Sequence, residues 1–109
     1  MADVPPNPDG SFTLYDDNGV TVTLTFPAAP VAGFKVVTKD VPSGLPGNYT
    51  WLLNFGVQNP AGRYLPSVAY SLQGTPRPDN KTWFIYYDGQ AHAMNGSHTT
   101  AGDPPIGYG

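Results

Sequence analysis

The sequence predicts an all-β protein, a single antiparallel β-sandwich of seven or eight strands with roughly the size of an immunoglobulin or fibronectin type III domain. Three observations predict it. Stretches of alternating apolar and polar residues recur every 8–14 residues or so. Thirteen Gly and thirteen Pro among 109 residues stand between these stretches as turn formers. No stretch of helix length shows a 3.6-residue period free of Gly and Pro. A small barrel or jelly roll is the alternative architecture.

The first half of the chain supplies four predicted strands, at residues 11–15, 20–26, 34–41 and 49–57. Asn18-Gly19 separates the first two, and both residues of such a pair tolerate the positive φ of a tight hairpin. The second strand, VTVTLTF, places its valines, Leu24 and Phe26 on one face and its threonines on the other. The fourth has the most apolar face, which we expect at the core centre: Tyr49, Trp51, Leu53, Phe55 and Val57.

The second half supplies predicted strands at residues 63–72, 81–87 and 90–94. Pro66 interrupts the first of these, which predicts an edge strand, a bulge or a crossing between sheets. Asp88-Gly89 predicts a tight turn between the other two. The Pro-rich residues 1–10 and the Gly-rich residues 95–109 are predicted as arms of a single domain spanning residues 1–109.

Composition excludes several classes of partner. Charged residues are 12% of the chain, about half the usual share, and the net charge is −3. Binding to nucleic acid requires clustered Lys and Arg, which the sequence lacks, and an anionic membrane surface is disfavoured for the same reason. No apolar stretch approaches 18 residues, so we expect no membrane insertion. The start, MADVPPNPDG, lacks the basic and apolar regions of a signal peptide.

Catalytic and metal-binding patterns are also missing. The residue types of a nucleophilic triad are present in Ser97, His98 and Asp103, but these residues lie in a Gly-rich stretch without a nucleophile elbow, so we do not expect a triad. His92 and His98 have no third nitrogen or sulfur ligand nearby for zinc. The Asp-rich turns lack the spacing and the Glu of a calcium loop. The sequence therefore predicts no catalytic residue, no metal, no cofactor and no enzymatic activity.

The aromatic residues, 13% of the chain, are the strongest functional clue, and they concentrate in KTWFIYYDGQAHAM. Alternation along this strand places Trp83, Ile85 and Tyr87 on the inner face. Phe84 and Tyr86 then lie on the other face, where a loop, a terminal arm, a ligand or a partner chain must meet them.

Three interpretations of Phe84 and Tyr86 follow. The chain itself covers them; or they form a platform that stacks on sugar rings; or they form a protein–protein interface, in which aromatic residues are enriched. Polar side chains that could bind sugar hydroxyls are nearby: Asn80, Asp88 and Gln90.

The sequence thus favours a non-catalytic interaction module of a surface, filament or virion assembly, placed outside the cell or on a cell or virion surface. Its expected partners are other protein subunits, including copies of itself in a homo-oligomer. One mode of contact would be a strand lent to a neighbour's open sheet edge. The alternative is a carbohydrate-binding module for a polysaccharide. Both use the same candidate residues: Phe84, Tyr86, Asp88, Gln90 and Asn80.

Overall fold

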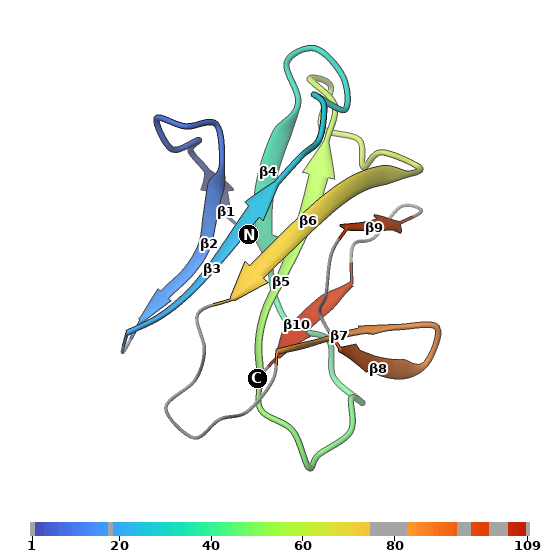
Figure 1. Ribbon diagram of the computed structural model, residues 1–109. Coiled ribbons are helices and arrows are strands. Elements are labelled where there is room, and N and C mark those ends of the chain that lie inside the picture. The colour runs from blue at the N-terminus through green and yellow to red at the C-terminus, as the bar shows by residue number, and fades with distance from the viewer. Residues whose placement is uncertain (1, 18, 75–82, 94–96, 101–104, 109) are drawn as a thin grey trace.

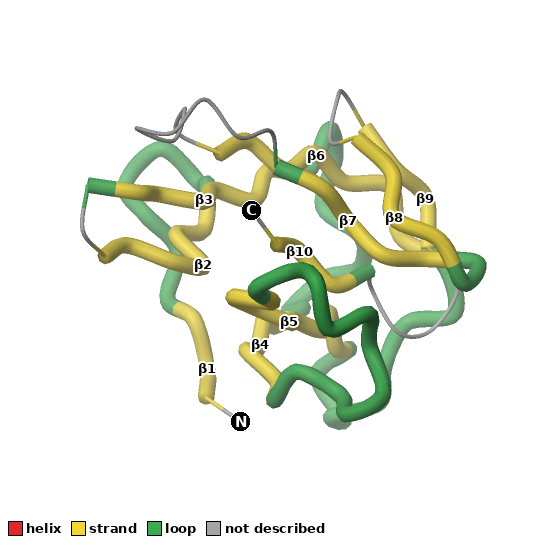
Figure 2. Tube along the Cα trace, turned by 90° about the horizontal axis from the view of Figure 1, so that it is seen from below, coloured by secondary structure: helices red, strands yellow, loops and turns green. Residues whose placement is uncertain are grey.

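The computed structural model describes residues 2–17, 19–74, 83–93, 97–100 and 105–108 (Figure 1). These residues form ten strands and no helix, and the strands build two antiparallel sheets. Viewed from below, β2 and β3 lie in one layer and β1, β4 and β5 in another (Figure 2). The prediction of an all-β antiparallel sandwich is confirmed.

The larger sheet has six strands in the order β1-β4-β5-β10-β7-β8. Their bounds are β1 Ala2–Val4, β4 Lys35–Lys39, β5 Trp51–Gln58, β10 Ile106–Tyr108, β7 Phe84–Tyr87 and β8 Gln90–Ala93. Asp88 and Gly89 join β7 to β8 with φ values of 54° and 73°. Two positive φ values are what a two-residue hairpin with the right-handed strand twist requires, so the predicted turn is confirmed.

The smaller sheet has four strands in the order β2-β3-β6-β9. Their bounds are β2 Phe12–Asp17, β3 Val20–Thr25, β6 Val68–Gly74 and β9 Ser97–Thr100. Tyr64 still bridges Gln58 of the larger sheet, whereas β6 pairs with β3 in the smaller one. The chain therefore crosses between the sheets around Pro66, which was one of the three outcomes predicted for that proline.

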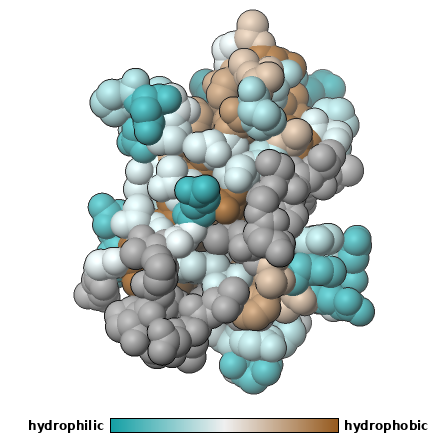
Figure 3. All heavy atoms as spheres, viewed as in Figure 1, coloured by the Kyte–Doolittle hydropathy of each residue, from teal (hydrophilic) through white to brown (hydrophobic). Residues whose placement is uncertain are grey.

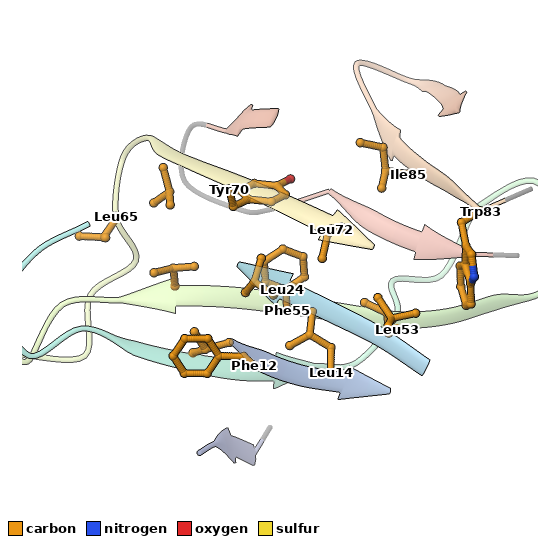
Figure 4. Close-up of a cluster of buried hydrophobic side chains, with 14 residues drawn as sticks. Phe12, Leu14, Leu24, Leu53, Phe55, Leu65, Tyr70, Leu72, Trp83 and Ile85 are labelled. Carbon is orange, nitrogen blue, oxygen red and sulfur yellow. The ribbon is translucent and has the colours of Figure 1, made fainter. Parts of the chain in front are cut away.

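The core fills the space between the sheets, from Leu65 at one end to Trp83 at the other (Figure 4). Phe55 of β5 and Tyr70 of β6 meet there edge to face, with ring centroids 5.4 Å apart. Each large apolar side chain removed from water in this way contributes roughly 1.5–3 kcal/mol to folding. The predicted core positions Leu53, Phe55 and Val57 are confirmed as buried.

Two strands lie within the stretch that was predicted as a C-terminal arm, and the prediction is wrong for them. Residues 97–100 form β9, and Ile106–Tyr108 forms β10, which is paired with both β5 and β7 inside the larger sheet (Figure 1). A three-residue strand is too short for alternation to reveal it, and its hydrogen bonds come from partners far away in sequence. At the other end, Ala2–Val4 of the predicted arm form β1. These three short strands raise the number above the predicted seven or eight.

Candidate functional site

The strand β7 separates its side chains as expected. Ile85 is fully buried in the core, and its neighbours Phe84 and Tyr86 are half-buried on the opposite, outer face of the larger sheet. Trp83 is buried, and Tyr87 packs partly against the core. The outer pair is therefore neither fully covered nor fully exposed.

The position of Trp51 differs from the prediction, and the difference creates the site. In the pairing of β5 with β10, Leu53 lies opposite Gly107 while Trp51 lies opposite Tyr108, the next residue. Leu52 is thus an extra residue, a β-bulge, which reverses the alternation of β5 at this point. Leu53 remains in the core and Trp51 turns to the outer face, where its ring centroid is 5.6 Å from that of Tyr86.

Four aromatic side chains form what we call the outer aromatic face: Tyr49, Trp51, Phe84 and Tyr86. Tyr49 contacts Trp51 with ring centroids 6.0 Å apart and is 41% exposed. The Trp51 indole Nε1–H donates a hydrogen bond to the Pro46 carbonyl (3.2 Å), which ties the ring to the preceding connection. The prediction that Tyr49 and Trp51 face the core is wrong, because the bulge turns Trp51 outward and Tyr49 lies in the connection before β5. The adjacent apolar residues Leu52 and Leu53 were the available signal of a change in alternation.

The rings of this face do not form a flat platform. The ring planes of Trp51 and Tyr86 meet at 79°, and those of Tyr49 and Trp51 at 75°. Such edge-to-face contacts are typical of aromatic packing in cores and interfaces. The surface is therefore ridged, with Trp51 between two tyrosines.

Of the polar residues predicted for the site, Gln90 lies away from this face. Asp88 is exposed at the hairpin turn. Gln90 is the register partner of Tyr87, so it lies on the side of the sheet opposite to Tyr86. The two-residue turn fixes this register, and it separates Gln90 from the aromatic pair. Asn80 lies outside the described residues.

The chain itself closes the other half of the outer face, over β4 and β5. The Tyr64 ring lies directly on Gly56, where an added Cβ would collide with the ring atom Cε1. Lys39 Nζ lies 4.6 Å from the centroid of the same ring, in a cation–π contact. Beside them, Val37 is only 1% exposed. The outer aromatic face is the part of this sheet surface that Tyr64 and Lys39 do not cover.

A second apolar surface lies at one end of the sandwich. Hydrophobic residues gather at the upper end of the molecule, where the connection from β3 to β4 lies (Figure 3). Val31 is 37% exposed in this connection. Its base is held by edge-to-face contacts among Phe12, Phe26 and Phe34, with centroids 5.2–5.9 Å apart. The exposed part consists of small side chains, so it offers less contact area than the outer aromatic face.

The inner side of the β7–β8 hairpin holds a group of titratable rings. Tyr87 and His92 stack with centroids 3.9 Å apart, and His92 Nε2 is buried with no hydrogen-bond partner among the described residues. Burial, reinforced by nearby Tyr87, raises the pKa of Tyr70 far above that of an ordinary tyrosine. A phenol held protonated in this way is not a nucleophile near neutral pH.

The described residues contain neither a cluster of metal ligands nor a membrane-spanning helix. Across the described part of the chain, no three His, Cys, Asp or Glu side chains come together as metal ligands. In the same residues, no helix is long and apolar enough to cross a membrane. Comparisons of the chain with protein-family models, curated proteins and solved structures found no match.

Proposed function

We propose that this chain is a non-catalytic interaction module of a surface, filament or virion assembly, and that it binds another protein subunit through the outer aromatic face. One observation carries the proposal: Trp51 lies between Tyr49 and Tyr86 in a row of edge-on rings outside the sandwich. Tyr and Trp are the side chains that most often anchor protein–protein interfaces. Trp51 and Tyr86 lie on strands of the same sheet, and a preorganised site lowers the entropy cost of binding.

A protein partner fits this face better than a polysaccharide does. A sugar ring stacks on a flat aromatic face, whereas neighbouring rings here stand at 75° and 79° to one another. Sugar hydroxyls also need polar partners beside the rings, and Gln90 lies on the opposite side of the sheet. A ridged aromatic surface instead suits the pockets and complementary ridges of a protein surface.

The test begins by identifying the partner. A photo-crosslinking amino acid replaces Tyr86 in the producing cells, and mass spectrometry identifies the crosslinked peptide. The matched control places the same crosslinker at Tyr64, which lies on the same sheet face but over Gly56. We expect one protein partner from position 86 that position 64 does not capture. A crosslink to the same partner at equal yield from both positions contradicts the proposal.

The second stage measures affinity with the purified partner. Trp51→Ala is expected to weaken binding about 30-fold, the equivalent of a hot-spot loss of about 2 kcal/mol, with Tyr64→Ala close to the parent protein. Circular dichroism verifies that both variants are folded. Unchanged affinity in Trp51→Ala refutes the role of this face. Retention on cellulose or chitin that depends on Trp51 would instead support the polysaccharide alternative.

A further inference from the structure

Few paired residues hold strand β1 at the edge of the larger sheet. It pairs with β4 over three residues only, in the register Ala2 with Thr38, Asp3 with Val37 and Val4 with Val36. Ala2 and Asp3 are exposed, and Val4 alone packs partly against the core. Few buried contacts and exposed backbone hydrogen bonds are the features of segments that open locally at low free-energy cost.

A stiff hinge follows the strand. Pro5 and Pro6 have no N–H, so the pairing with β4 cannot continue past Val4. Two consecutive prolines also favour an extended, semi-rigid backbone. Residues 2–6 therefore form an arm, which we call the β1 arm, with its pivot at the two prolines.

The turn after the hinge is anchored independently of the β1 arm. The Asn7 N–H donates to the Ser11 carbonyl (2.7 Å), and Asn7 Nδ2 donates to Thr13 Oγ1 of β2 (2.9 Å). The Ser11 N–H and hydroxyl both donate to Asp9 Oδ1, at 2.9 and 2.6 Å. The β1 arm can thus detach from β4 while the turn that carries it stays fixed to β2.

An open groove of about 540 Å³ runs beside the β1 arm, lined on the arm by Val4, Pro5 and Pro6 and on the body by residues that include Phe12 and Phe34. Opening the arm would uncover the edge of β4, where Val36 and Val37 are each 1% exposed. That edge therefore needs a strand to cover it.

We propose that two copies of this chain exchange their β1 arms, so that β1 of each pairs with β4 of the other. The exchange preserves every backbone pairing of the closed form, which is why swapping identical elements is a low-cost route to dimers. The partner is a second copy because residues 2–4 already match this edge in register and in burial of Val4. Pro5 and Pro6 favour the extended backbone that lets the arm reach a second copy, which offsets part of the cost of association. This contact goes beyond the proposed function, since it uses a different region from the outer aromatic face.

The absence of cysteine from the sequence permits a direct test. One preparation carries Ala2→Cys and a second, isotope-labelled preparation carries Thr38→Cys; these positions are register partners, and paired strand positions lie within disulfide reach. The two are mixed, equilibrated and oxidised with oxidised glutathione. Exchange predicts a disulfide between labelled and unlabelled chains, detected by mass spectrometry after non-reducing electrophoresis.

A matched control measures random collision. Ser43→Cys, an exposed loop position, replaces Thr38→Cys in a parallel mixture. Pairing holds two thiols at a millimolar effective concentration, so we expect the Ala2–Thr38 disulfide in at least about tenfold excess over the control disulfide. Equal yields overturn the proposal. An oxidised Ala2→Cys/Thr38→Cys double variant that is entirely monomeric also overturns it, whereas a covalent dimer supports it.

The result is separable from the test of the outer aromatic face. Adding Trp51→Ala to both preparations is expected to leave the disulfide yield unchanged, because β4 separates β1 from β5, the strand that carries Trp51. A loss of the disulfide with Trp51→Ala would contradict the arm mechanism and would assign the dimer to the aromatic face.

Discussion

The two tryptophans of this protein are expected to behave differently, and the contrast tests the candidate site directly. Trp83 is 5% exposed at the end of the core and lies so close to Gly74 that an added Cβ there would collide with the indole. Trp51 lies on the outer face, beyond the Leu52 bulge. The perturbation is the replacement of each tryptophan, singly, by alanine.

The expected costs follow from the contacts. Trp83→Ala removes a buried side chain from a filled site, so the free energy of unfolding should fall by about 3–5 kcal/mol. Trp51→Ala removes an exposed hydrogen bond to Pro46, worth about 1 kcal/mol, and two edge contacts, each near the lower limit of about 0.5 kcal/mol at a half-exposed site. We therefore expect a loss of about 2 kcal/mol for Trp51→Ala, at least about 1 kcal/mol less than for Trp83→Ala.

Urea denaturation followed by circular dichroism measures both losses. Tryptophan fluorescence adds an independent measurement. Trp83→Phe leaves only Trp51, whose emission should lie at longer wavelength and be quenched by iodide. Trp51→Phe leaves only the buried Trp83, which iodide should barely quench. Acrylamide, which is neutral, controls for the net charge of −3. Equal losses of stability together with equal quenching would place Trp51 in the core and refute the assignment of the outer aromatic face.

Three further outcomes can be measured. Gly56→Ala should destabilise the protein by about 1–3 kcal/mol in urea denaturation, because the new methyl group displaces Tyr64. Adding Tyr64→Ala to the same chain should relieve much of that loss. A Gly56→Ala variant as stable as the parent protein would contradict this packing. The side-chain and backbone hydrogen bonds from Ser11 lower the pKa of Asp9 in the folded protein. The ionised Asp9 therefore stabilises the fold fully above the ordinary Asp pKa, and this stabilisation is lost as the pH falls through the lowered pKa of the folded state. Titration of the Asp9 carboxyl by NMR should show a midpoint that rises in Ser11→Ala, and an unmoved midpoint would exclude this cause. Burial raises the pKa of Tyr70, so its contribution to stability is complete below about pH 10 and falls above it. In urea denaturation at several pH values, Tyr70→Phe should lose less stability at alkaline pH than the parent protein. An identical alkaline loss would exclude Tyr70 as its cause.

The predictable part of the fold was encoded locally. Each of the seven sequence ranges predicted as strands overlaps a strand of the structure, because alternation records which face of each strand is buried. The Asp88-Gly89 turn was predictable for the same reason, since positive φ is a property of the two residues themselves. Phe84 and Tyr86, the predicted half of the outer aromatic face, needed only this local information.

The unpredicted part depends on pairing between distant segments. The bulge at Leu52 exists only because β10, about 55 residues further along the chain, pairs with β5 in a shifted register. Reading residues 49–57 as one regular strand therefore placed Tyr49 and Trp51 in the core, although β5 begins only at Trp51. Gln90 was predicted to lie near the aromatic pair, but its face follows from the register with Tyr87, which the residue types alone do not show.

The two proposed contacts have different consequences for assembly because of where they lie on the larger sheet. In the order β1-β4-β5-β10-β7-β8, the arm exchange uses one edge, while the outer aromatic face covers β5 and β7. Reciprocal exchange between two copies is isologous and closes on itself, so it ends at a pair. Growth beyond pairs would then require the outer aromatic face, which the exchange leaves accessible. In this scheme Trp51→Ala stops larger assemblies but not pairs, whereas deleting residues 2–4 removes the pairs and leaves the aromatic contact intact.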